Sequence, residues 1–493
     1  MIPLSLSSAV RSAHWPSAAR SAVWLVLVLC VAFIAALLPV DLVFVCLTGA
    51  ILVVTALITP IAGAAALLIL APLRTLIATE STLALPLDIG QIALLVVLGT
   101  WLIREIASRG SFPRLSWSPF VLPVLLFLGV AGLTGFSAQS VGLWLPEWLK
   151  WAQIVILLIF VRCAAGRANW RWFLAGLVAG GAANAVIGIY QFFGGSGALH
   201  LLISDRFFRA FGTFGQPNPF GGFMGLLLPL AATGALASIH TFRASPGRRH
   251  LPLITFYVLS SVLMLCGILM SWSRGAWLGL AAAATVLVAA IPRQLWHGLA
   301  LVTAGLGVAL TLWLAGWLPD ALVARATSAA AELFTLGDVR GVSITTENYA
   351  VVERLSHWQA ALNMTRSHPW LGVGLGNYEY AYASYRLINW PEPLGHAHNY
   401  YLNVLAEGGL IGLIGYGKVW LLIVVLTWRA LRHPDTATRL VVAGLLGSWI
   451  YLLVHSLFDN LYVNNVFLYL GVMLGIASLL YDDAKRCITL RFV

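Results

Sequence analysis

Residues 399–428 read NYYLNVLAEGGLIGLIGYGKVWLLIVVLTW, an apolar stretch in which only Glu407 and Lys418 carry charge. About 20 apolar residues suffice for an α-helix to cross the roughly 30 Å hydrocarbon core of a bilayer. Comparable stretches recur along the chain of 493 residues, which is 60% hydrophobic and only 10% charged. Soluble domains have a lower apolar fraction and a higher charged fraction. The sequence therefore predicts an all-α polytopic membrane protein.

Hydropathy predicts about fourteen membrane spans, within a range of about twelve to fourteen. The range arises because residues 41–78 contain Pro60 and Arg74 and fit either two helices or one helix with a re-entrant piece. The predicted spans are 21–39, 41–58, 60–78, 88–104, 118–136, 145–162, 172–193, 220–240, 251–271, 276–292, 295–318, 399–428, 440–458 and 463–481.

Positive charge is concentrated in alternate connections between these spans. The connections on the side of the two termini hold most of the arginines, against Glu105, Asp435, Asp482 and Asp483. Cytoplasmic loops carry an excess of Lys and Arg, so we expect both termini in the cytoplasm. The net charge of +11 then follows from topology and does not indicate nucleic-acid binding. The five cysteines lie in predicted spans or cytoplasmic segments, which argues against a disulfide framework.

Two predicted external loops, 194–219 and 319–398, are longer than the other connections. Long ordered loops are usually functional. The second contains the pattern of an amphipathic helix that should end before Pro369, with Val351, Leu355, Trp358 and Leu362 on one stripe. The glycines of GVGLG, residues 372–376, lack the strand or lysine that a nucleotide-binding loop requires.

Three arginines are predicted at the external boundary of the membrane. Arg206 and Arg209 lie in the first long loop, and Arg274 lies where the span 251–271 turns into the next one. An unpaired arginine that enters hydrocarbon costs a few kcal/mol. Guanidinium groups grip phosphate oxygens with two donors each, so the set predicts an anion site that fits a diphosphate. The alternative is that each arginine reaches lipid headgroups or pairs with Asp205.

His396, His398 and Asn399 stand at the junction of the second loop and the span 399–428. Partial burial and nearby arginines keep an imidazole neutral at physiological pH. A neutral imidazole can act as a general base for an attacking hydroxyl. The alternatives are a metal site completed by Glu392 or His368, and purely structural histidines.

Three further polar residues fall within or beside predicted spans. Glu407 lies inside the span 399–428, where a carboxylate must find a partner or stay protonated. His455 and Asp459 lie one helical turn apart at the end of another span. They either line the same cavity as the arginines or, as the sequence favours, cap and terminate the helix.

Three separated segments resemble the O-antigen ligase and polymerase superfamily of bacterial envelope glycosyltransferases. They are FRAFGTFGQPNPFGG (208–222), SWSRGAWLGL (271–280), and HWQAALNMTRSHPWLGVGLGNY (357–378) followed by HAHNYYLNVLAEGGLIG (396–412). In ligases of this superfamily, a histidine is followed directly by Asn, Ser or Gln. After nine further residues comes a glycine, and three positions after that glycine comes another small or aromatic residue. His398, Asn399, Gly409 and Gly412 match that pattern.

The resemblance implies a glycosyltransferase of the class called GT-C in the bacterial inner membrane. Its donor would be an undecaprenyl-diphosphate-linked glycan on the periplasmic face, transferred with inversion and without a metal or other cofactor. Arg274 and Arg209 would bind the diphosphate, and His398 would activate the acceptor. Residues expected to contact substrate are Arg206, Asn218, His396, Asn399, Glu407, Arg354, Tyr378 and Arg386. Residues 1–193 would then be a scaffold, 194–481 the catalytic region and 482–493 a cytoplasmic tail.

The acceptor stays open at this point. It could be lipid A core, which would make the protein a ligase, another lipid-linked repeat unit, which would make it a polymerase, or a protein hydroxyl. The histidine motif favours a ligase. A polyprenyl-glycan transporter is the alternative from another class, although its charged groups would be expected near the membrane midplane rather than at the boundary.

Overall fold

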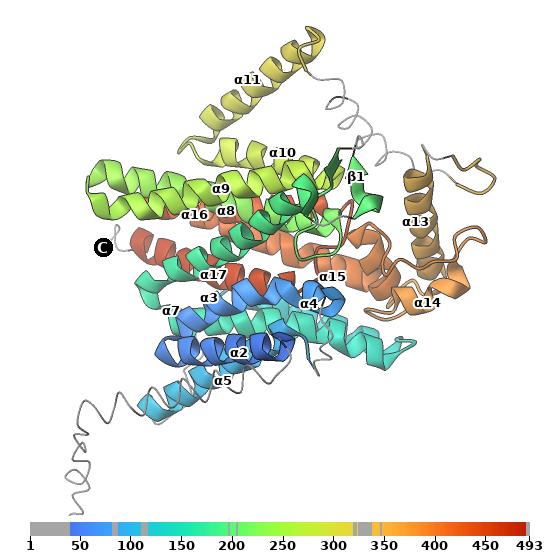
Figure 1. The fold of residues 1–493 in the computed structure, drawn as a ribbon, viewed down its shortest axis with the longest axis horizontal. Helices are drawn as coiled ribbons and strands as arrows, with labels where there is room; N and C mark the ends of the chain where they lie inside the picture. The colour runs from blue at the N-terminus through green and yellow to red at the C-terminus, as the bar shows by residue number, and fades with distance from the viewer. Residues whose placement is uncertain are drawn as a thin grey trace, which may run out of the picture.

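The protein is an all-α polytopic membrane protein, described here from a computed structural model (Figure 1). The structure describes residues 40–80, 87–109, 117–195, 198–203, 206–318, 323, 338–345 and 348–489. The predicted span 21–39 lies outside the described residues. The helices are α2 (Val40–Ile58), α3 (Pro60–Leu70), α4 (Arg74–Glu80), α5 (Ile89–Arg109), α6 (Val121–Leu133), α7 (Val141–Tyr190), α8 (Pro217–Ala244), α9 (Leu251–Ser271), α10 (Arg274–Ala290), α11 (Leu295–Leu314), α13 (Tyr349–Ser367), α14 (Tyr378–Tyr385), α15 (Tyr400–Ala430), α16 (Thr436–His455) and α17 (Val466–Thr489).

The predicted spans from 41–58 onward coincide with helices. Among the described residues, ten helical segments are long and apolar enough to cross a membrane, and three shorter apolar helices account for the other predicted spans. Residues 60–78 form α3 and α4, joined by one 3₁₀ turn at Ala71–Leu73. The polytopic, all-helical prediction is confirmed.

Helix α7 contains two predicted spans, 145–162 and most of 172–193, with helical backbone between them. Its apolar segments are Val141–Ala165 and Asn169–Gly195. Just before the first segment, the backbone N–H of Ser140 donates to Oδ1 of Asn377, which lies in the connection between α13 and α14. Gln191, in the second, bonds Gly212 in the loop that precedes α8. Between them, Arg162 pairs with Asp482 near the C-terminal end of α17, at 2.9 Å. The chain therefore crosses and returns within α7, with a helical connection where the sequence predicts a loop.

The centre of the bundle is formed by α8, α16 and α17. The apolar windows of α8, α16 and α17 are each 78% buried, whereas that of α11 is only 6% buried. Burial of an apolar helix on all sides marks the core of a bundle, and exposure of one marks a lipid-facing helix. Figure 1 shows α11 projecting from the rest of the bundle.

Helices α13 and α14 gather at one end of the bundle, opposite the C-terminus (Figure 1). We call this the loop end, and the opposite end, which carries Arg162, Arg293, Arg432 and Arg439, the basic end. The predicted helix is confirmed as α13, which ends before Pro369. Of its predicted apolar stripe, Leu355 and Trp358 are buried, whereas Val351 and Leu362 are only half-buried. It buries more than the predicted stripe, including Ser356, His357, Ala360 and Met364, because α14 and α15 both pack against it.

The first long loop docks on the turn between α9 and α10. Strands β1 (Leu202–Ile203) and β2 (Phe207–Phe208) pair antiparallel within it. The backbone N–H of Ala210 then donates to the Met270 carbonyl at 2.9 Å. This contact brings Arg209 beside the start of α10.

Candidate active site

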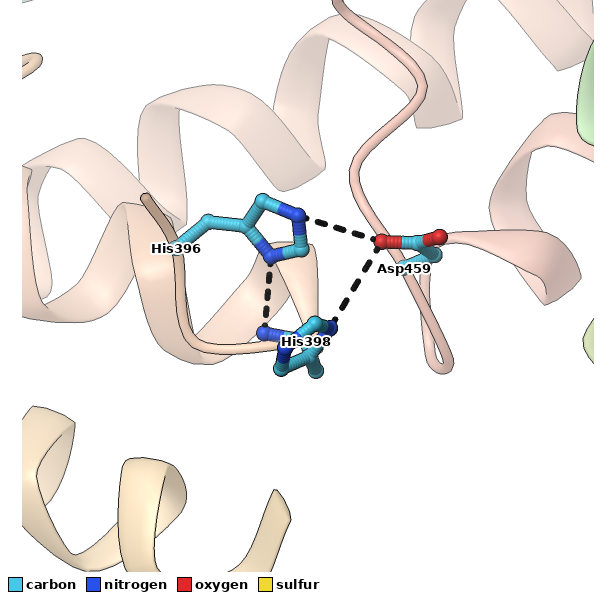
Figure 2. A group of neighbouring side chains, drawn as sticks. All are labelled: His396, His398 and Asp459. Atoms are coloured by element: carbon cyan, nitrogen blue, oxygen red, sulfur yellow. Dashed lines mark hydrogen bonds and ion pairs between the residues drawn. The ribbon is translucent and has the colours of Figure 1, made fainter. Parts of the chain in front are cut away.

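Two histidines and one aspartate meet at the loop end of the bundle (Figure 2). His396 and His398 precede α15, and Asp459 follows α16. The Nε2 atom of His396 lies 3.3 Å from Asp459 Oδ1, and the Nδ1 atom of His398 lies 3.9 Å from the same oxygen. All three residues are at least half-buried, and Asp459 is only 3% exposed. A buried carboxylate therefore faces two imidazoles.

The start of α15 fixes the position of these histidines. The side chain of Asn399 caps the helix by accepting the backbone N–H groups of Tyr401 and Leu402. The backbone N–H of Tyr400 donates to the Ser456 carbonyl at 2.8 Å, which ties the loop to the end of α16. His398 itself has a φ of 51°, a left-handed conformation that is uncommon outside glycine. Strain of this kind persists only where the surroundings hold it in place, and it clusters at functional sites.

His396 has both ring nitrogens engaged. Its Nδ1 accepts the backbone N–H of His398 at 3.0 Å, so in the neutral ring the proton sits on Nε2 and points at Asp459. His398 differs, because its Nδ1 is buried and makes no hydrogen bond within the described residues. Both ring nitrogens of His396 are thus engaged, whereas His398 has a ring nitrogen without a hydrogen-bond partner among the described residues.

Burial keeps both imidazoles neutral. It lowers the pKa of His398 to about 3, with a smaller contribution from neighbouring His396. Burial also lowers the pKa of His396, although Asp459 acts in the opposite direction. A neutral imidazole is the form that accepts a proton from a hydroxyl.

A cavity of about 240 Å³ adjoins this cluster through Asp459 and contains two of the three arginines predicted to bind an anion, Arg209 and Arg274. Arg209, Arg274 and Arg354 line it together with Asp459. The lining thus holds three guanidinium groups and one carboxylate. The remaining lining residues are Asn218, Trp272, Ser273, Gly275, Ala350, His455 and Phe458. The whole lining comes from the loop before α8, the start of α8, the α9–α10 turn, α13, and the end of α16 with the residues that follow it, so the cavity exists only in the folded protein.

Two of the arginines are held by the α9–α10 turn and its neighbours. The Nε of Arg209 donates to the Ser271 carbonyl at 3.0 Å, and its Nη2 donates to Asn218 Oδ1 at 3.1 Å. Trp272 has a φ of 56° and ends α9, so that α10 can begin at Arg274. The N-terminus of a helix carries partial positive charge, which adds to that of the Arg274 guanidinium. The arrangement favours a bound anion.

The sequence favoured a capping role for His455 and Asp459, and the structure corrects that interpretation. Both residues line the arginine cavity, and the Asp459 carboxylate contacts His396. The sequence could not show this contact, because it joins side chains that are 63 positions apart (459 minus 396).

Other predicted substrate contacts lie outside the cavity lining. Arg206 is exposed, with its guanidinium 5.1 Å from the centre of the Phe207 ring. Arg386 donates to the Pro391 carbonyl at 3.1 Å on a separate surface of the loop end. The structure therefore distinguishes Arg209 from Arg206, which the sequence motif does not.

Glu407 and Tyr378 connect the loop end to α15. The backbone N–H of Tyr378 donates to Glu407 Oε1 at 3.0 Å, which supplies the partner that a buried carboxyl group needs. The Tyr378 hydroxyl donates to the His357 carbonyl at 3.1 Å. Both side chains are buried, and neither lines the arginine cavity.

Gly372 and Gly409 serve this same packing. A Cβ on Gly372, at a φ of 64°, would lie 2.3 Å from the backbone carbon of Glu407. A Cβ on Gly409, at a φ of 62°, would lie 2.3 Å from the backbone carbon of Trp370. The two backbones touch where α15 breaks at Gly409, so only glycine fits at these positions.

His357 is a residue that sequence reasoning missed. It projects from α13, its Nδ1 lies 3.1 Å from the Tyr378 hydroxyl, and its ring centre lies 5.8 Å from that of His398. Burial lowers its pKa to about 4. In the sequence, His357 lies off the apolar stripe of the predicted helix, and its one signal is its place as the first residue of the segment 357–378.

Comparison with known proteins adds one finding. Residues 259–417 match the O-antigen ligase family model. The match extends from within α9 into α15, so it includes Arg274, Arg354, His396 and His398, and it covers less than half of the 493 residues. It confirms the resemblance to O-antigen ligases over that segment. Arg209, Asn218 and Asp459 complete the cavity from outside it. No curated protein matches the chain.

The histidine cluster also has the spacing of a metal site, since ligand atoms of His396, His398 and Asp459 lie within 4.8 Å of one another. Neither Glu392 nor His368, the third ligands considered from sequence, belongs to it. His396 would need a lone pair on Nε2, yet its Nδ1 lone pair already accepts the His398 N–H. A neutral imidazole cannot offer both. The donor set therefore fits a hydrogen-bonded histidine–aspartate cluster better than a metal ion.

Proposed function

We propose that this protein transfers a glycan from a polyprenyl diphosphate, such as undecaprenyl diphosphate, to an acceptor hydroxyl at the loop end of the bundle. The observation that carries the proposal is the cavity in which Arg209, Arg274 and Arg354 converge beside the cluster of His398 and Asp459. The match of residues 259–417 to O-antigen ligases supports glycan transfer of the ligase or polymerase type. The excess of basic residues at the other end supports a loop end that faces the periplasm of the bacterial inner membrane.

The arginines would bind the diphosphate and stabilise it as it leaves. The bond between the anomeric carbon and the diphosphate oxygen breaks, and its electron pair stays on that oxygen. Fixed guanidinium groups in a partly dehydrated cavity lower the energy of the developing charge. They would thereby fulfil the role that a metal ion plays in other diphosphate chemistry.

His398 would act as the general base. If the ring carries its proton on Nδ1, which lies 3.9 Å from Asp459 Oδ1, the Nε2 lone pair would accept the proton of the acceptor hydroxyl as the new bond to the anomeric carbon forms. Asp459 would stabilise the resulting imidazolium, as a carboxylate does in other histidine–aspartate pairs. Attack on the face opposite the departing diphosphate inverts the anomeric carbon.

The experiment is transfer by the purified full-length protein from a synthetic undecaprenyl-diphosphate glycan, in the presence of EDTA. Candidate acceptors are lipid A core, a second lipid-linked glycan and a hydroxyl-bearing protein. We expect product with one acceptor, which distinguishes ligase from polymerase or protein glycosylation. Loss of activity in EDTA that Zn²⁺ or Mg²⁺ restores would overturn the metal-free mechanism.

The same assay tests a transporter as the second possibility. Reconstituted vesicles that move the labelled donor lipid across the bilayer, without product on any acceptor, would replace the transferase by a transporter.

Arg206→Ala is the matched control for the cavity arginines, because Arg206 is an exposed arginine in the same loop as Arg209 but outside the cavity. It should keep full activity.

A further inference from the structure

A second arginine-lined cavity lies at the basic end of the bundle, opposite the loop end that holds the histidine cluster. It has a volume of about 370 Å³ and is walled by two turns, one between α10 and α11 and one between α15 and α16. The lining residues that carry the argument are Arg293, Leu295, Trp428, Arg432, His433 and Arg439. Among the described residues, the lining includes three arginines and no acidic residue.

Arg439 is the least satisfied of these groups. Its side chain projects from the first turns of α16 and the residue is only 9% exposed, yet its Nε makes no hydrogen bond within the described residues. The one hydrogen bond of its side chain to the described residues is a 3.4 Å contact from Nη1 to the Ala290 carbonyl. A buried guanidinium without an anionic partner is costly, so a ligand with negative charge would stabilise it.

The acidic groups nearby are already engaged elsewhere. Asp435 caps α16 by accepting the backbone N–H and hydroxyl of Thr438 at 2.8 and 2.6 Å. Asp483 lies 3.1 Å from Nε2 of His433. Neither lines the cavity. The positive charge of the arginines is therefore not neutralised from within the described part of the chain.

The rest of the wall is suited to a lipid rather than a free anion. Leu295 begins α11, whose apolar window is only 6% buried, so the cavity opens beside a lipid-facing helix. Trp428 is 43% exposed at the end of α15, where aromatic residues mark the membrane interface. Arg293 donates to the Pro434 carbonyl at 3.3 Å, which ties the two turns together. We propose that this cavity binds the phosphate headgroup of an anionic phospholipid from the leaflet at the basic end.

A metal ion is a poorer occupant of this region, although His433, Asp483 and Cys487 lie close enough to hold one. The Nδ1 of His433 accepts the backbone N–H of Asp435 at 3.1 Å, which leaves the proton of a neutral ring on Nε2, facing Asp483. Three arginines beside the site also repel a cation. Basic pockets between membrane helices commonly take anionic headgroups instead.

The test is lipid binding by the full-length protein in delipidated micelles. Thermal unfolding is followed during titration with phosphatidylglycerol, with phosphatidylethanolamine, or with inorganic phosphate alone. Phosphatidylglycerol should raise Tm in a saturable manner, because a ligand that binds only the folded state stabilises it. Equal shifts with phosphatidylethanolamine, or the same shift with inorganic phosphate, would overturn an anionic-lipid site.

The variants separate the cavity from general surface charge. Arg432→Gln removes an exposed lining arginine whose side chain makes no hydrogen bond to the described residues, and it should weaken phosphatidylglycerol binding by about fivefold. Arg439→Gln should weaken it at least as much. Arg429→Gln, which removes an exposed arginine of α15 outside the lining, is the matched control and should leave binding unchanged. An equal loss in Arg429→Gln and Arg432→Gln would refute the site, even if Arg439→Gln failed to fold.

Discussion

Replacing Asp459 by asparagine tests how the histidine cluster works. The substitution keeps the shape of a side chain that is only 3% exposed and removes its charge. The carboxylate lies 3.3 Å from Nε2 of His396 and 3.9 Å from Nδ1 of His398. If His398 takes a proton from the acceptor, an imidazolium forms beside Asp459 in the transition state, and the variant loses that charge pair.

The size of the loss follows from the 3.9 Å separation. Two unit charges at this distance attract by about 4 kcal/mol at an effective dielectric constant of about 20. Dehydration of the pair reduces the realised part, so we expect kcat to fall by about 10² to 10³-fold. The KM for the donor should stay constant or fall, because Asp459 is the one carboxylate in the arginine cavity and opposes a bound diphosphate.

The assay is steady-state transfer kinetics by the purified variant, with its Tm measured in parallel. Asp338→Asn is the control, because Asp338 is a half-exposed acid of the loop end that pairs with Arg340. It should change neither parameter. A wild-type kcat in Asp459→Asn would refute the charge pair, and a raised KM with unchanged kcat would show that Asp459 organises binding instead.

Three further predictions concern packing, pH and donor recognition. Gly409→Ala should lower stability by about 2–4 kcal/mol and reduce Tm, because the new Cβ would lie 2.3 Å from the backbone of Trp370. Gly417→Ala on the same helix should be neutral, because its Cβ meets nothing within 4 Å, and equal Tm values for the two variants would contradict this prediction. Burial lowers the pKa of His357 from 6.5 to about 4, so between these pH values the unfolded state binds more protons than the folded state, and stability should fall as pH drops through this window. If His357→Gln left the slope of unfolding free energy against pH unchanged, His357 would be excluded as the cause. Arg354→Gln should raise the donor KM by about tenfold and Arg206→Gln should not, which competition between donor and inorganic diphosphate can measure; equal effects would remove the cavity as the diphosphate site.

The membrane spans were predictable because hydropathy is a local property. Each span reveals its length and apolar content without its neighbours, and α13 reveals its own amphipathic stripe. The helical connection between the two apolar segments of α7 was not predictable, because a short polar connection has the same hydropathy whether it is helical or a loop. Arg274 and His398 stood out in sequence because charged or titratable groups at a membrane boundary are costly.

The site itself depends on contacts between distant segments. Asp459 becomes a partner of His396 only when the end of α16 packs on the start of α15, through the bond from Tyr400 to Ser456. The glycines at 372 and 409 are required by the close approach of two backbones, which no local pattern specifies. His357 joins the cluster because α13 folds over the loop end.

The most direct test of the account measures donor binding and glycan transfer in the same preparations of wild type, His398→Gln and Arg274→Gln. The account predicts that His398→Gln binds the polyprenyl-diphosphate glycan as tightly as wild type and forms product at least a hundredfold more slowly, because the imidazole is needed only for proton transfer. It predicts that Arg274→Gln loses donor affinity, because its guanidinium lines the anion cavity. Wild-type transfer by His398→Gln, or unchanged donor affinity in Arg274→Gln, would contradict the account.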